Sequence, residues 1–258
     1  MMFQRIYKSI LVLILTMSKK KKPSINEMRE KSQAPRGGLV YKFVDYLAYY
    51  PAKLFLYLPI TPNQITFLWI AIQIISTFFL IKGEYWTTIV ALLVFQSMFI
   101  LDCTDGIVAR YKKQFSIKAR FLDDMGHFIA NSCLLIFFTL GVYQQYRNPI
   151  YLLFGLIAVV SFLLNKASTL NPIWCNEDQV NEIIKTTRKC YPDKQNKWVL
   201  GAFNFLRLEH FGNLLFWGVV FGVPQIVLIV YGLIYFLELL RKLISQYLVL
   251  GRIDKKNG

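Results

Sequence analysis

Four side chains that can bind a metal stand where two apolar segments meet. Asp102 and Asp105 lie three residues apart at the end of one apolar run. Asp123 and His127 lie four residues apart at the start of the next run. On a helix, either spacing places both side chains on one face. The short basic loop at residues 111–118 makes the two helices antiparallel neighbours, so the two faces can converge. Three carboxylates and an imidazole in one small volume predict a site for hard divalent cations.

The residues that follow Asp105 suit a phosphate group. Gly106 and Ala109 have little bulk, so a ligand can approach the helix backbone there. Arg110 offers a planar guanidinium that can hold phosphate through two parallel hydrogen bonds. Phosphoryl transfer needs metals to neutralise charge, a donor clamp and a base beside the nucleophile. The sequence alone therefore predicts a metal-dependent phosphate site.

The composition indicates a membrane protein. Of the 258 residues, 55% are apolar and 17% are charged, and the mean hydropathy is +0.40. Soluble domains average about 45–50% apolar and about 25% charged residues. The net charge of +15 is explained by basic cytoplasmic loops, so we expect no nucleic-acid partner. The four cysteines show no C-x-x-C spacing and are expected to be free thiols.

Long apolar runs predict membrane-spanning helices, each of which needs about 20 residues. Four such runs precede residue 165, at 64–81, 86–101, 125–143 and 149–164. Residues 211–240 would form a helix of about 45 Å, which is too long for one span. Residues 222–224 (Gly-Val-Pro) offer a turn, so we place two spans there, the fifth beginning near residue 198. The expectation is an all-α integral membrane protein with six transmembrane helices, and five spans is the alternative.

The distribution of basic residues predicts the orientation. If the amino terminus is inside, 28 of the 30 lysines and arginines lie in inner segments. The other two are Lys82 and Arg147. Basic loops stay on the cytoplasmic side of a membrane. We therefore expect both termini to be cytoplasmic in a multi-pass protein of the plasma or inner membrane, with the acidic site at the cytoplasmic surface.

The segments before the first span are expected at the membrane surface. Residues 39–60 carry five tyrosines among sparse charges, which predicts an amino-terminal interfacial amphipathic helix, broken near Pro51. Residues 1–38 are expected to form a basic amino-terminal tail, of which residues 18–38 are mobile and touch anionic lipid. The apolar run ending at Met17 is too short to span, and no cleavage pattern follows it. Residues 1–16 are therefore either a surface anchor or lie upstream of a start at Met17.

The rest of the chain is expected to form one domain and a tail. Residues 61–247 would form the six-span domain. Its polar cytoplasmic segment lies at 167–197 and has a short helix at 177–189. Residues 248–258 would form a cytoplasmic tail.

The acidic junction resembles the signature of the CDP-alcohol phosphatidyltransferases, D-x-x-D-G-x-x-A-R followed after a loop by G-x-x-x-D-x-x-x-D. Residues 102–110 match the first half at every fixed position, and Asp123 matches the third aspartate. Residues 61–66 (TPNQIT) are similar to the family's P-N-x-x-T entry to the first span. The resemblance covers roughly residues 40–245. The family's six helices and cytoplasmic site agree with the hydropathy pattern.

The resemblance implies a role for each matching residue. Asp102, Asp105 and Asp123 would bind Mg²⁺ or Mn²⁺, two ions in all. Arg110 and the backbone at Gly106 and Ala109 would hold the pyrophosphate of a CDP-linked donor. Asn63 and Thr66 would lie near the nucleotide, unless they only cap the first helix. The resemblance also implies a homodimer.

Two positions depart from the family's pattern. Ala119 stands at the second glycine, which adds one methyl group near the nucleotide. His127 stands at the fourth aspartate, which in the family is thought to bind metal and take the proton from the acceptor hydroxyl. A neutral imidazole can serve as that base at pH 7. Otherwise one metal site is weakened and activity is low or absent. Asp124 points about 100° away on the helix and is a poor substitute.

The predicted activity is transfer of a phosphatidyl group from CDP-diacylglycerol to a polar alcohol, with release of CMP. Two alternatives remain open. One is a CDP-choline or CDP-ethanolamine phosphotransferase with a lipid acceptor, and the other is a catalytically impaired protein that binds CDP or lipid. A transporter is disfavoured because the acidic residues stand at a span end, not at the bilayer midplane.

Overall fold

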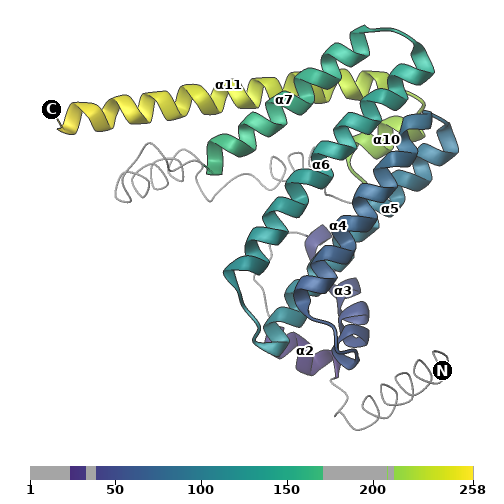
Figure 1. Ribbon diagram of the computed structural model, residues 1–258, viewed down its shortest axis with the longest axis vertical. Coiled ribbons are helices and arrows are strands. Elements are labelled where there is room, and N and C mark those ends of the chain that lie inside the picture. Colours follow the sequence, from purple (N-terminus) through teal and green to yellow (C-terminus); the bar gives the residue numbers. More distant parts are fainter. Residues whose placement is uncertain (1–23, 33–38, 171–207, 209–211, 258) are drawn as a thin grey trace, which may run out of the picture. The chain divides into compact units, whose positions relative to one another are not determined.

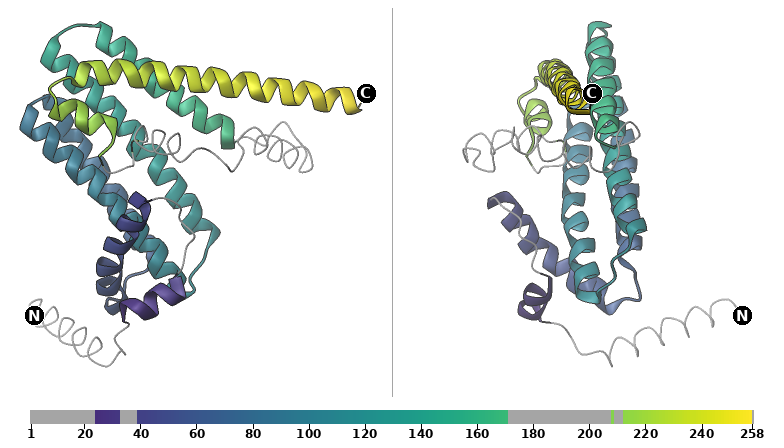
Figure 2. Two further views of the ribbon diagram at one scale, coloured as in Figure 1. Left: turned by 180° about the vertical axis from the view of Figure 1, so that it is seen from behind. Right: turned by 90° about the vertical axis from the view of Figure 1, so that its left-hand side faces the viewer.

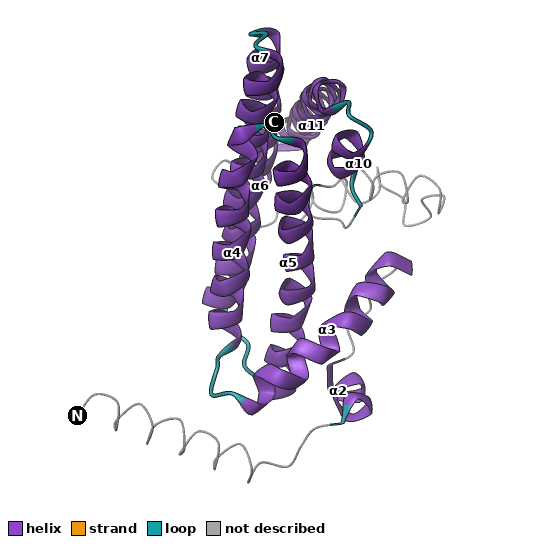
Figure 3. Ribbon diagram, turned by 90° about the vertical axis from the view of Figure 1, so that its right-hand side faces the viewer, coloured by secondary structure: helices purple, strands orange, loops and turns teal. Residues whose placement is uncertain are grey.

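Helices form all of the regular structure in the part of the chain that the computed structural model describes. That part comprises residues 24–32, 39–170, 208 and 212–257, and it contains no strand (Figure 3). The all-α prediction is confirmed for these residues. In chain order the elements are α2 (Ile25–Ser32), α3 (Leu39–Tyr57), α4 (Pro62–Phe78), η1 (Phe79–Lys82), α5 (Tyr85–Lys112), α6 (Ile117–Tyr146), α7 (Ile150–Leu170), α10 (Leu214–Val220) and α11 (Pro224–Asn257) (Figure 1).

Four helices within the described residues are long and apolar enough to cross a membrane. They are Pro62–Lys82, Tyr85–Lys112, Ile117–Tyr146 and Ile150–Ser168. They contain the four apolar runs that the sequence places before residue 165. The chain is therefore a multi-pass membrane protein, while the total of six spans stays a prediction.

The outcome for the last two predicted spans is mixed. The predicted start of the fifth span near residue 198 and the predicted helix at 177–189 lie outside the described residues. Helix α10 has only seven residues, and its first turn is capped by Asn213, whose side chain accepts a hydrogen bond from Phe216 N at 3.0 Å. A helix of this length cannot cross the hydrocarbon core on its own.

The predicted turn before Pro224 is confirmed. Gly222 has a φ of 71°, a left-handed conformation that glycine adopts without strain. Helix α11 begins at Pro224, a residue that suits the first position of a helix. It continues to Asn257 without a break. It therefore passes residue 248, where the tail was expected to begin.

The chain divides into two compact units. Unit 1 comprises residues 1–73 and 97–127, and unit 2 comprises residues 74–96 and 128–258. Unit 1 contains all of the acidic junction. Its buried core is formed by side chains of α2, α3, α4 and α5. These are Met28, Val44, Ala48, Tyr49, Ala52, Leu56, Ile65, Phe99, Cys103, Ile107 and Val108.

Unit 2 has its own core, in which α7 packs along α11 (Figure 2). Glycines permit these close contacts. A Cβ at Gly155 would overlap Thr139, and one at Gly232 would lie 2.8 Å from the carbonyl oxygen of Phe154. Small residues let membrane helices approach closely, which is how they gain packing energy without a hydrophobic driving force.

Helix α3 is continuous through Pro51, so the predicted break there is wrong. Ala48 and Ala52 on either side are fully buried in the core of unit 1. Thr104 Oγ1 donates a hydrogen bond to the Ala48 carbonyl at 3.2 Å. Tight packing and side-chain hydrogen bonds of this kind let a membrane-associated helix continue through proline.

The two faces of α3 differ sharply. One face is buried at every fourth residue, at Val44, Ala48, Ala52 and Leu56. The other face exposes large apolar and amphipathic side chains, at Phe43, Tyr46, Tyr50 and Leu54. Exposed aromatic rings of this kind are typical of helices that lie in the headgroup layer. The position of α3 at the membrane interface stays a prediction.

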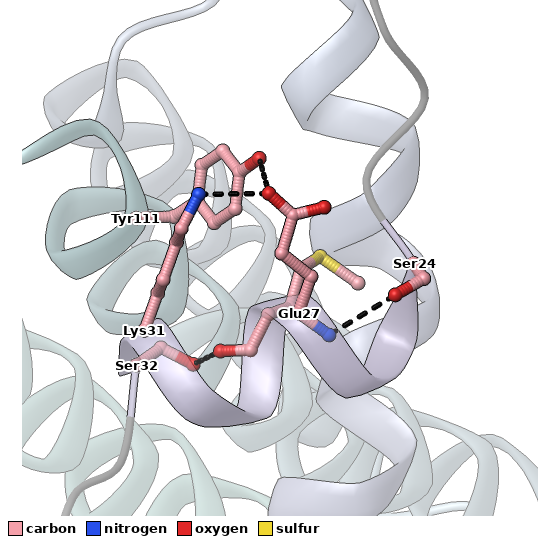
Figure 4. A network of polar contacts seen from close by, with 6 residues as sticks. Ser24, Glu27, Lys31, Ser32 and Tyr111 are labelled. Carbon is pink, nitrogen blue, oxygen red and sulfur yellow. Dashed lines mark hydrogen bonds and ion pairs between the residues drawn. The ribbon is translucent and has the colours of Figure 1, made fainter.

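The expectation of a mobile tail over residues 18–38 is wrong for residues 25–32, which form α2. Glu27 N donates to Ser24 Oγ at 3.1 Å, which caps the start of the helix (Figure 4). Met28 is completely buried and anchors α2 in the core of unit 1. An apolar anchor and a cap together explain why so short a helix is ordered.

Helix α2 is also tied to the end of α5 through Glu27. The Glu27 carboxylate accepts from Lys31 Nζ at 2.7 Å and from Tyr111 Oη at 3.3 Å (Figure 4). The hydrogen bond from Glu27 raises the pKa of Lys31 above its usual value. Tyr111 follows the signature arginine, so these contacts place α2 beside the predicted phosphate site.

Candidate metal and phosphate site

The end of α5 and the start of α6 are joined by a tight connection. Lys113 has a φ of 54°, and Gln114 N donates to Ala109 O at 2.9 Å, which terminates α5. Ser116 Oγ then accepts from Ala119 N at 2.9 Å and caps α6. The short connection holds the two helices as neighbours, as the sequence predicts.

Asp102 on α5 meets Asp123 and His127 on α6. His127 Nε2 lies 3.4 Å from Asp102 Oδ1 and 3.8 Å from Asp123 Oδ1. One ligand atom from each residue lies within 4.8 Å of the others. The side chains of Asp102 and His127 are 12% and 19% exposed, whereas that of Asp123 is 41% exposed. The structure brings these three residues together as their spacing predicted, and their role as metal ligands stays a prediction.

The donor set formed by these three residues fits a divalent cation. Neighbouring ligands of an octahedral ion with bonds of about 2.1 Å are about 3.0 Å apart, and opposite ligands are about 4.2 Å apart. The distances of 3.4 and 3.8 Å from His127 Nε2 lie between these two values, so a small shift of the side chains would let all three residues reach one ion. Asp123 Oδ1 is buried and accepts no hydrogen bond from the described residues. Because burial of a carboxylate oxygen without a donor is unfavourable, a cation would stabilise this arrangement.

Asp105 lies outside this group of three and is held by α4. Its Oδ2 accepts hydrogen bonds from Thr66 Oγ1 at 2.6 Å and from Trp69 Nε1 at 3.1 Å. Two donors on one oxygen hold the carboxylate in place. The predicted metal role of Asp105 stays a prediction. What the structure does show is that Asp105 joins α5 to α4.

The first turn of α4 is capped by Thr61 and Gln64, and not by Asn63 and Thr66, the two residues considered from the sequence. Thr61 N donates to Gln64 Oε1 at 2.8 Å, and Gln64 N donates to Thr61 Oγ1 at 3.4 Å, which is a reciprocal capping box. Thr66 instead orients Asp105, and Asn63 is exposed in the first turn. The interpretation of Asn63 and Thr66 as mere caps is therefore wrong, and their predicted place near the nucleotide stays a prediction.

Trp69 is a site residue that no sequence pattern singled out. It is fully buried, and its ring lies against the His127 imidazole with centroids 4.8 Å apart and planes inclined by 35°. A Cβ at Gly126 would overlap Ile70 and come within 3.0 Å of the Trp69 ring. Glycine at 126 thus lets α6 approach α4. The available signal was the position of Trp69 three residues after Thr66 on one helix face, but a tryptophan in an apolar run usually indicates only core packing.

Arg110 lies alongside Gly106 and is anchored by α2. Its Nε donates to the Ser32 carbonyl at 2.9 Å. A Cβ at Gly106 would lie 3.1 Å from one of the terminal guanidinium nitrogens of Arg110, so glycine leaves room for this group against the helix. Ala109 and Ala119 are half-buried on either side of the interhelical connection. The contacts of these residues with a pyrophosphate stay predictions.

Comparison with protein families identifies the domain. Residues 59–186, about half of the chain, match the family described as CDP-alcohol phosphatidyltransferase. The match contains the acidic junction and the entry to α4, and it begins close to the predicted domain start at residue 61. A search of curated proteins finds no match. Residues 59–186 of this chain therefore belong to the CDP-alcohol phosphatidyltransferase family.

Proposed function

We propose that this protein transfers a phosphatidyl group from CDP-diacylglycerol to a polar alcohol and releases CMP, as a step in phospholipid synthesis. The observation that carries this proposal is the meeting of Asp102, Asp123 and His127 where two membrane-spanning helices begin and end. Acidic groups at such depth are expensive and usually functional. The family and the membrane helices support phosphatidyl transfer, and the choice of donor and acceptor is our proposal.

In this proposal, different site residues bind the metal, bind the phosphate groups and accept the proton of the alcohol. Asp102, Asp123 and His127 hold divalent metal, Mg²⁺ or Mn²⁺, with Asp105 as a further ligand for a second ion. When bound, the metal neutralises charge on the phosphates and on the leaving CMP. Arg110 binds the pyrophosphate beside Gly106, where the helix backbone is accessible.

The proton of the acceptor alcohol goes to Asp123 in this proposal. The alcohol oxygen forms a bond to phosphorus, the bond from phosphorus to the CMP oxygen breaks, and a carboxylate takes the hydroxyl proton. Asp123 is the most exposed of the three clustered residues, so it can meet a polar acceptor. His127 Nε2 faces both carboxylates, which favours a role in holding metal.

The proposed setting explains why the reaction belongs at a membrane surface. We infer six spans, an interfacial α3, both termini in the cytoplasm and a homodimer. The acyl chains of the donor then stay in the bilayer while the polar acceptor enters from the cytoplasm. The domain would extend over residues 61–247, beyond the part matched by the family.

The test is an incubation of purified protein in detergent with CDP-diacylglycerol and a panel of alcohols, with lipid products identified by mass and CMP measured. We expect a phosphatidyl-alcohol and an equal amount of CMP, both lost with EDTA and in Asp102→Asn. The exposed neighbour variant Asp124→Asn is the control and should remain active.

Three results would contradict the proposal. Turnover that continues under chelation would show that metal is not needed. Use of CDP-choline or CDP-ethanolamine with a diacylglycerol acceptor, in place of CDP-diacylglycerol, would identify the alternative transferase. Nucleotide binding without any product across the panel would indicate a pseudoenzyme.

A further inference from the structure

We propose that His127 is a metal ligand through Nε2 and that it gives the site a preference for Mn²⁺ over Mg²⁺. This inference rests on the proposed function, which supplies the divalent metal. It adds that the preferred ion is Mn²⁺ and that His127 causes the preference.

The first argument is the direction in which the imidazole points. Its Nε2 lies 3.4 Å from Asp102 Oδ1 and 3.8 Å from Asp123 Oδ1. Charge-assisted N–H···O hydrogen bonds are shorter, about 2.7–2.9 Å. Separations of 3.4 and 3.8 Å, from one nitrogen to carboxylates on two helices, leave space for these atoms to share a cation.

The second argument is that the ring is held in this orientation by packing. The Trp69 ring lies on the imidazole at 4.8 Å between centroids, and Trp69 is itself fixed by its hydrogen bond to Asp105. Gly126, the residue before His127, brings α6 against Trp69 and Ile70. A ligand held by its surroundings loses little freedom when metal binds, so the nitrogen is prepared for coordination.

The third argument is the chemistry of the donors. Mg²⁺ is a hard ion that favours oxygen ligands in a near-ideal octahedron. Imidazole nitrogen favours first-row transition metals, among which Mn²⁺ also accepts carboxylate and phosphate oxygens. Replacing one carboxylate by an imidazole also removes a negative charge, and a nitrogen ligand offsets that loss less for Mg²⁺ than for Mn²⁺. Two carboxylates and one imidazole at one point therefore suit Mn²⁺ better than Mg²⁺.

The test measures metal binding by the full chain in detergent, after removal of any histidine tag. Mn²⁺ titration followed by electron paramagnetic resonance gives its dissociation constant, and displacement by Mg²⁺ gives the second constant. Pulsed resonance on the bound Mn²⁺ detects coupling to a ligand ¹⁴N nucleus. The chain has two histidines, so His210→Asn is the control for the origin of the nitrogen signal.

We expect ¹⁴N coupling in the wild-type protein and in His210→Asn, and its loss in His127→Asp while Mn²⁺ still binds. The ratio of Mg²⁺ to Mn²⁺ dissociation constants should fall at least about tenfold in His127→Asp and stay unchanged in Asp124→Asn. Absence of ¹⁴N coupling in the wild-type protein, absence of Mn²⁺ binding, or an unchanged ratio in His127→Asp would overturn the proposal. The wild-type spectrum decides the question even if the aspartate variant does not fold.

The outcome is separable from that of the proposed function. Nitrogen coupling together with a failure to release CMP under any metal would count against the transferase and would support the ligand assignment. CMP release together with a spectrum that lacks ¹⁴N would count against His127 as a ligand and leave the transferase standing.

Discussion

Trp69 connects the two parts of the acidic site. Its Nε1 donates to Asp105, while its ring packs on His127. The indole therefore restrains a carboxylate on α5 and an imidazole on α6 from one position on α4. Because all three groups lie at least partly out of water, small displacements would change the distances that metal binding depends on.

Replacement of Trp69 by phenylalanine tests this restraint. Trp69→Phe keeps an aromatic ring against His127 but removes the hydrogen bond from Trp69 Nε1 to Asp105 Oδ2. The hydrogen bond from Thr66 Oγ1 to the same oxygen is kept. We expect a loss of about 0.5–2 kcal/mol in the free energy of unfolding, the range for one side-chain hydrogen bond inside a membrane protein. CMP release should also fall. The measurement is thermal unfolding in detergent beside the activity assay.

The matched control is Trp86→Phe, because Trp86 is 74% exposed. This substitution should change neither quantity. Equal effects of the two substitutions would show that Trp69 contributes only as an apolar ring.

Local spacing of residues predicted part of the site and could not predict the rest. Asp102 lies on one helix, and Asp123 and His127 lie on the next, after a short loop. This arrangement was sufficient to predict that the three side chains meet. Trp69 and Ser32 were missed because their contacts come from α4 and α2, which are distant in sequence. No periodicity specifies which residue of another helix will lie against a given carboxylate.

Helix α2 determines part of the surroundings of Arg110. Its last residue, Ser32, accepts from Arg110 Nε, and Glu27 accepts from Tyr111 Oη. An eight-residue helix is not stable alone in water, so its order depends on the burial of Met28. The position of the predicted phosphate-binding arginine therefore depends on an apolar contact made far from it in sequence.

We predict that Met28→Ala releases α2. Burying alanine in place of methionine typically costs about 2–5 kcal/mol, more than a short helix can lose and remain docked. Trypsin should then cut after Arg29 and Lys31 at least about tenfold faster than in the wild-type protein. Cleavage is followed by mass spectrometry of the amino-terminal fragments.

Asn26→Ala is the matched control for α2, because Asn26 is exposed on the same helix. Its cleavage rate should match that of the wild-type protein. A Met28→Ala protein cut at the wild-type rate would show that α2 is held by its polar contacts alone.

The elements themselves were largely predictable, and the exceptions have physical causes. Apolar runs specified α4 to α7 because a span must be apolar over most of its length. The break expected at Pro51 was wrong because packing of Ala48 and Ala52 outweighs the local effect of proline. Residues 25–32 were predicted to be part of a polar tail, because a single buried methionine does not produce a helical repeat of apolar residues.

For the whole molecule, the length of α6 and the distribution of charge both support the proposed topology. Helix α6 has 30 residues, which corresponds to about 45 Å, whereas the hydrocarbon core is about 30 Å thick. Its apolar run at 125–143 fits that core, and the acidic residues then lie at the boundary. With 28 of the 30 basic residues on the inner side, the boundary that carries Asp123 faces the cytoplasm in the proposed orientation.

This topology predicts opposite labelling of two glutamines at the ends of α6. Gln114 precedes the helix and Gln144 lies in its last turn, and both are exposed. In a background with the four native cysteines replaced, a membrane-impermeant maleimide should label Gln114→Cys in sealed inverted vesicles and Gln144→Cys in intact cells. The cysteine-free parent should not be labelled, and each variant should retain CMP release. Labelling of both positions from one side would show that α6 does not cross the membrane. The reverse pattern would place the acidic site on the outer surface, where a cytoplasmic nucleotide donor could not reach it.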